Sequence, residues 1–116
     1  MKAIAKLRTV RHSDRKLRRV ADMIRGQSVD KSFAILNILR NTSKGAVIIE
    51  GVLKSAVANL QQSEAGSAVG TDALKVSMVM IDRGPIIKRI RPRAQGRAYR
   101  IQKNLSHVTV EVRTEV

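Results

Sequence analysis

The sequence predicts an α+β fold in which three helices pack on a small three-stranded antiparallel sheet, with one long protruding β-hairpin arm. Apolar residues recur at helical spacing through the first half of the chain and alternate near its two ends. A basic stretch lies between two alternating segments that can pair, which predicts the arm. With 116 residues the chain has the length of a single domain. We expect a globular body at about 1–82 and 104–116, and an arm at about 83–103.

Residues 2–10, "KAIAKLRTV", alternate roughly between polar and apolar and predict a short strand. Ser13 is a suitable N-cap for a first helix, and Gly26 stands where a C-terminal cap belongs. The apolar face of this helix contains Leu17, Val20, Ala21 and Ile24. The opposite face contains Arg15, Arg18, Arg19, Asp22 and Arg25.

A second helix is predicted from Ser28 or Asp30 to Arg40, and it should bury Phe33, Leu36 and Leu39 or their neighbours. A third helix should start near Thr42 or Ser43. Its apolar face continues through about four turns, with Ala46, Ile49, Leu53, Ala56, Val57 and Leu60.

Residues 63–72 read as a loop that leads into two strands. Alternation at Leu74, Val76, Met78 and Met80 predicts one strand, and alternation at Val108, Val110 and Val112 predicts its antiparallel partner. If the first of these strands continues to about Ile90, its roughly 16 residues at ~3.3 Å each span ~50 Å. That length exceeds the width of the body, so the intervening basic stretch should protrude.

Several function classes are excluded by composition. The chain has no cysteine, and His12 and His107 alone cannot make a standard zinc site, so neither a metal nor a cofactor is predicted. The nine acids are scattered, and Ser13 beside His12 is more economically a helix cap than a nucleophile, so we expect no enzyme and no small-molecule substrate. No apolar run approaches a membrane span or a signal peptide, which predicts a cytoplasmic protein without a membrane partner.

The net charge of +14 is unevenly distributed. Residues 1–25 hold nine Lys or Arg against two acids, residues 26–82 hold five against five, and residues 83–116 hold nine against two. Two cationic segments flanking a neutral middle predict contact with a polyanion. The candidate RNA-binding residues are Lys6, Arg8, Arg11, His12, Arg15, Lys16, Arg18, Arg19, Arg25, Arg83, Lys88, Arg89, Arg91, Arg93, Arg97, Arg100 and Lys103.

A large folded RNA is the polyanion that the residue types favour. Arginine outnumbers lysine between Arg83 and Lys103, and its planar fork binds phosphates bidentately. Phe33 and Tyr99 are the only aromatic residues, which argues against a single-strand reader that stacks bases on a sheet. The second and third predicted helices are poorly charged, so neither makes a good recognition helix.

The stretch "GPIIKRIRPRAQGRAYRIQKNLSHVTVEV", residues 84–112, resembles the C-terminal half of the L-twenty-two family of large-subunit ribosomal proteins in its bacterial form. The segments "VRHSDRKLRRVADMIRG", "SFAILNIL" and "VLKSAVANLQQ" agree as well, so the resemblance covers nearly the whole chain in order. The chain departs from the family at Asp14, where proline is common, at Leu60, where alanine is usual, and at Asn104-Leu105, where Arg-Thr is frequent.

The resemblance implies a structural protein of the ribosome that binds 23S rRNA, acts early in subunit assembly and touches neighbouring large-subunit proteins. It implies that the body sits near the peptide exit and that the hairpin tip lines the nascent-peptide tunnel. The position of Ile87-Lys88-Arg89 is associated in the family with macrolide resistance. The tunnel-tip region then comprises Ile87, Lys88, Arg89, Ile90, Arg91, Pro92, Arg93, Ala94, Gln95, Gly96 and Arg97.

Two other function classes remain open from the residues alone. A free nucleic-acid chaperone or nucleoid-type binder also needs high positive charge and little sequence readout. An RNA-modifying enzyme would need a cofactor pocket or a catalytic pair, and the sequence shows neither.

Overall fold

The computed structural model describes residues 2–62, 70–92 and 94–114. Three antiparallel strands lie in the order β1-β3-β2, so the last strand is the central one. The elements in chain order are β1 (Lys2–Val10), α1 (Asp14–Ile24), α2 (Val29–Leu39), α3 (Lys44–Gln62), the short turn η1 (Thr71–Ala73), β2 (Leu74–Pro92), the tip turn η2 (Ala94–Gly96) and β3 (Ala98–Thr114). The predicted α+β fold is confirmed.

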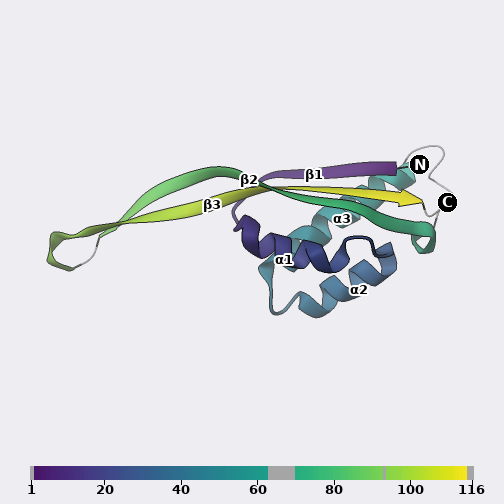
Figure 1. The fold of residues 1–116 in the computed structure, drawn as a ribbon, viewed down its shortest axis with the longest axis horizontal. Helices are drawn as coiled ribbons and strands as arrows, with labels where there is room; N and C mark the ends of the chain where they lie inside the picture. The colour runs from purple at the N-terminus through teal and green to yellow at the C-terminus, as the bar shows by residue number, and fades with distance from the viewer. Residues whose placement is uncertain (1, 63–69, 93, 115–116) are drawn as a thin grey trace.

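The three helices cover one face of the sheet, and in the described part of the chain no helix covers the other face (Figure 1). The three valines of β3 predicted to share one face, Val108, Val110 and Val112, are fully buried. The predicted apolar faces of the first and third helices are also buried, from Leu17 to Ile24 in α1 and from Ala46 to Leu60 in α3. Aliphatic side chains thus make up the core between the helices and the sheet.

The prediction for the first helix is right in extent, but the role of Ser13 needs correction. Ser13 occupies the N-cap position with extended backbone, yet its side chain makes no capping hydrogen bond. At the other end, Gly26 adopts a φ of +80°, where glycine is unstrained. The Gly26 amide donates to the carbonyl of Val76 at 3.0 Å, which ties the end of α1 to β2.

Of the three residues that the second helix was predicted to bury, only Leu36 is fully buried. Val29, Ser32 and Leu36 are buried, whereas Phe33 and Leu39 are only partly buried against the core. The buried residues lie three and four positions apart, so they form one narrow stripe along the helix. Ser32 is accommodated in that stripe because its hydroxyl donates to the carbonyl of Ser28 at 2.8 Å.

The predicted alternation in β2 is wrong after Val76. A bulge lies between Val76 and Met78, so that Val79 and Ile81 are buried while Met80 is exposed. One inserted residue moves every later side chain to the opposite face of a strand. The Ser77 hydroxyl donates to the carbonyl of Glu111 at 3.2 Å on the neighbouring strand. Of the predicted loop 63–72, residues 63–69 lie outside the described residues.

The hairpin of β2 and β3 continues well past the body (Figure 1). The strands are 19 and 17 residues long, and they pair without a third strand from Ile86 opposite Asn104 to Pro92 opposite Ala98. This hairpin gives the molecule its long axis, with overall extents of 64 × 26 × 17 Å. The expectation that the strand starting at Leu74 reaches about Ile90 is confirmed.

None of the helices in the described ranges is long and apolar enough to cross a membrane.

Candidate nucleic-acid interface

The two basic segments of the sequence meet at the root of the hairpin. β1 ends and α1 begins at the point where the hairpin leaves the body (Figure 1). The Thr9 amide donates to Nδ1 of His107 at 2.9 Å, and the Ser106 hydroxyl donates to the carbonyl of His12 at 2.7 Å. These bonds hold the N-terminal basic segment against the base of the arm, and they give His107 a structural role there.

Asp14 connects α1 to the arm at the same place. Its side chain is only 7% exposed, and its carboxylate lies 2.8 Å from Nη1 of Arg18 and 3.7 Å from Nε of Arg83. A buried carboxylate requires such partners, because leaving it unpaired would cost several kcal/mol. Arg18 and Arg83, both predicted to bind RNA, therefore have an anionic partner within the protein.

Arg18 and Arg25 also protect the free edge of β2. Since β2 is an outer strand of the sheet, part of its backbone has no partner strand. Arg18 donates to the carbonyl of Ile81 at 3.1 Å, and Arg25 donates to the carbonyl of Val79 at 2.8 Å. Arg25 is additionally paired with Asp22 at 2.5 Å. Sequence reasoning treated both arginines as free cations, and it could not see that α1 runs beside this edge.

The remaining cations of α1 are exposed and, among the described residues, have no ion pair: Arg15, Lys16 and Arg19. Lys16 and Arg19 line an open cleft of about 510 Å³ together with Lys44 from the start of α3. The cleft is completed by His12, Val20, Met23, Leu39, Thr42 and Ser43. Lys44 was missed by sequence reasoning, because only the packing of α3 beside α1 brings it to this cleft.

Lys6 and Arg8 lie on β1 and are exposed. They line a depression of about 320 Å³ with Asp82 and His107 at the base of the arm. Arg11 is exposed in the connection to α1, and His12 is half-buried.

The arm carries the densest group of cations with no acid among them. Lys88, Arg89, Arg91, Arg97 and Arg100 are exposed, and Lys103 is half-buried. The predicted contact Arg93 lies outside the described residues. Between Arg83 and Val110 the sequence contains no Asp or Glu. Charge neutralisation of the arm must therefore come from the body, as at Arg83, or from another molecule.

The described residues contain no group of three or more His, Asp or Glu side chains placed to hold a metal ion. Their arrangement is suited to binding phosphates over a long, narrow surface, since the cations are spread along both strands of the hairpin and along α1. Isoleucines between these cations, such as Ile86 and Ile90, are exposed on the arm and not packed in a core.

The chain matches a known protein family over most of its length. Residues 5–113 match the model of the family described as Ribosomal protein L22p/L17e. The match spans all three helices, most of the sheet and the entire arm.

Proposed function

Because the chain belongs to the ribosomal protein L22p/L17e family, it is a structural constituent of the large ribosomal subunit, and we propose that it binds 23S rRNA through α1 and the arm. The family acts in translation in the cytoplasmic ribosome, and its role is structural and not enzymatic. We further propose that the tip of the arm lines the nascent-peptide exit tunnel and that the protein supports subunit assembly.

The main support for the proposed rRNA binding is the arm, which exposes both cations and apolar side chains and has little core of its own. A two-stranded ribbon has almost no core of its own, and isolated hairpins are marginally stable in water. Ile90 is 70% exposed and Tyr99 is 53% exposed near the end of the arm. Beyond Arg83, the arginines in the described part of the arm have no ion pair. Exposed apolar residues and such arginines on one slender element fit a channel through folded RNA, where phosphates neutralise the cations and bases cover the apolar side chains.

The body offers support for contacts with neighbouring large-subunit proteins. Ile38 on α2 is 76% exposed and Val47 on α3 is 44% exposed. We propose that these exposed apolar side chains lie where neighbouring large-subunit proteins contact the body.

Sedimentation of cell extracts tests the proposed function against a free chaperone or nucleoid-type binder. We expect the tagged full-length chain to migrate with the large subunit and with whole ribosomes, and to stay there through a moderate salt wash. Recovery chiefly in ribosome-free fractions, or with the nucleoid, would overturn the proposal. A subunit-bound fraction that nuclease treatment of rRNA releases would support the RNA contact in particular.

The structure divides the three arginines of α1 and its C-cap residue Arg25 into two pairs with different expected effects. Replacing Arg15 and Arg19 by Ala should weaken binding to 23S rRNA and lower the slope of log affinity against log salt by about 2, or about 0.9 for each phosphate contact. It should leave the free energy of unfolding within ~0.5 kcal/mol, because these side chains are exposed surface residues.

The matched control replaces Arg18 and Arg25 by Ala. Here we expect a loss of roughly 1–3 kcal/mol of stability, since one buried carboxylate and two edge carbonyls lose their donors. Urea denaturation and filter binding at several salt concentrations measure both quantities. Equal salt slopes for the Arg15/Arg19 variant and the unaltered protein would refute α1 as an RNA contact.

A further inference from the structure

We propose that an open notch at the tip of the arm holds one unpaired RNA nucleotide, with its base against Tyr99 and its phosphates on Arg91 and Arg97. This inference rests on the proposed binding to rRNA and adds to it a single position where a base, and not only the phosphate backbone, is recognised. The occupant to which it commits is a nucleotide that RNA presents outside a duplex.

The register of the hairpin divides the arm into two faces. Arg91 pairs with Tyr99, and Arg89 pairs with Ile101, so these four side chains project from the same side of the ribbon. Ile90 pairs with Arg100, and Lys88 pairs with Gln102, on the opposite side. The arm's single aromatic residue therefore lies on a face where arginines are its cross-strand and diagonal neighbours.

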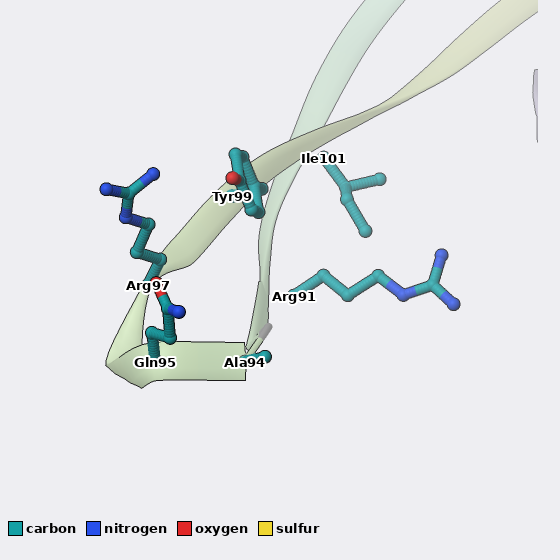
Figure 2. A pocket seen from close by; sticks show the side chains of 6 residues that line it. All are labelled: Arg91, Ala94, Gln95, Arg97, Tyr99 and Ile101. Carbon is teal, nitrogen blue, oxygen red and sulfur yellow. The ribbon is translucent and has the colours of Figure 1, made fainter.

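The notch lies on the Tyr99 face and measures about 600 Å³. Figure 2 shows Tyr99 and Ile101 on one strand, Arg91 on the other, and Ala94 and Gln95 in the turn that closes the tip. The side chains of Arg91 and Arg97 extend on either side of the tyrosine ring (Figure 2). The ring is 53% exposed, and it lines the notch together with both arginines and Ile101.

These side chains match the parts of a nucleotide. An aromatic ring provides a stacking surface for any base, and arginines beside it bind phosphate or stack on the base themselves. Gln95 can donate to and accept from a base edge. Its backbone φ of 67° lies in the left-handed region, and with Gly96 at 70° it shapes the tight turn at the tip.

Charge complementarity favours RNA over a peptide as the occupant. Among the described residues, every charged side chain lining the notch is an arginine, and the sequence has no acid from Arg83 to Val110. A neutral or basic peptide would leave these guanidinium groups unneutralised, whereas a nucleotide supplies the charge and the ring together. An acidic peptide is the competing occupant, and the experiment below includes it.

Tyr99 can serve as an intrinsic fluorescence probe, because it is the only tyrosine and the chain has no tryptophan. Intrinsic fluorescence of the full-length protein therefore reports on this ring alone. We expect a short oligouridylate to quench it, and an RNA duplex with the same number of phosphates to bind without comparable quenching. A titration of N-acetyl-tyrosinamide in parallel corrects for light absorbed by the RNA.

Variants separate stacking from charge. With dye-labelled RNA, Tyr99→Leu should lower the affinity for oligouridylate roughly 5- to 100-fold and leave the affinity for the duplex unchanged, while Tyr99→Phe should retain both. Arg91→Gln and Arg100→Gln remove the same charge from opposite faces. Arg91→Gln should weaken oligouridylate binding more and should also lower its salt slope more, because only Arg91 lies on the face that holds the nucleotide.

The results of these titrations distinguish a nucleotide in the notch from an acidic peptide there and from RNA binding elsewhere on the protein. Equal affinity of Tyr99→Leu and the unaltered protein for oligouridylate would overturn the notch while leaving rRNA binding intact. The same conclusion would follow if the duplex quenched Tyr99 as strongly, or if oligoglutamate quenched it and oligouridylate did not. Absence of binding to every RNA probe would overturn the proposed rRNA contact and the notch together.

Discussion

Replacing Arg89, Arg91 and Arg97 together by Gln is expected to lower the affinity for 23S rRNA about 100-fold at ~0.15 M salt. Each lost phosphate contact reduces the dependence of log affinity on log salt by about 0.9, so three contacts change the slope by roughly 3. All three side chains are exposed on the arm, and no acid lies nearby in the sequence. Filter binding of purified 23S rRNA over a range of salt concentrations measures both the affinity and the slope.

A control with the same change in net charge replaces Lys31, Arg40 and Lys75, which are exposed on the body and belong to neither predicted RNA-binding segment. We expect this variant to lose less than about 10-fold in affinity, since only long-range attraction is weakened. Equal losses for the two triple variants would show that binding follows net charge alone, and would remove the arm from its proposed role.

Gly84→Ala at the root of the arm is expected to lower the free energy of unfolding by roughly 1–3 kcal/mol, the usual cost of forcing extra atoms into a packed site. A Cβ here would lie 3.0 Å from the carbonyl oxygen of Leu105, 3.1 Å from its carbon and 3.3 Å from Cε1 of His107. Two of these neighbours are backbone atoms of the central strand, which cannot move aside as a flexible side chain can. Urea denaturation followed by circular dichroism measures the effect.

Gly51→Ala is the matched control, and its expected effect has the opposite sign. Gly51 lies inside α3, is exposed, and has no atom within 4 Å of the added Cβ. Alanine in a helix interior is favoured over glycine by about 0.5–1 kcal/mol, so this variant should be more stable than the parent. A loss of stability in both variants, or in neither, would contradict the conclusion that the close approach of Leu105 requires a glycine at position 84.

The predictions for the third helix and for the last strand succeeded because each rests on a local pattern that repeats over many residues. The apolar residues of α3 follow helical spacing over 19 residues, and packing buries every one of those predicted. Val108, Val110 and Val112 alternate in the same way along β3. Over such lengths a wrong period would place several large apolar residues in water, so one assignment is strongly favoured.

The errors lie where one residue changes the pattern. Ser77 inserts a bulge into β2, which exposes Met80 and buries Val79 and Ile81. Nothing in the residues around Ser77 distinguishes the bulged from the regular strand, because both leave alternate side chains apolar. In α2, Leu36 is buried as predicted, but Ser32 is buried in place of its neighbour Phe33. The hydrogen bond that makes a buried serine acceptable forms only once the helix exists.

By itself the sequence determined that this protein has an aliphatic body, a paired basic arm and two cationic segments, since periodicity and charge are properties of neighbouring residues. Only the tertiary structure decided which Lys and Arg side chains have partners within the protein and which are left to bind another molecule. In the folded protein, Arg18 and Arg25 donate hydrogen bonds to the edge of β2, and Arg83 forms an ion pair with Asp14. Lys44 lies beside α1 and lines the cleft there. Ion pairs and hydrogen bonds between distant segments form only when packing brings those segments within a few ångströms, and no local pattern records that approach.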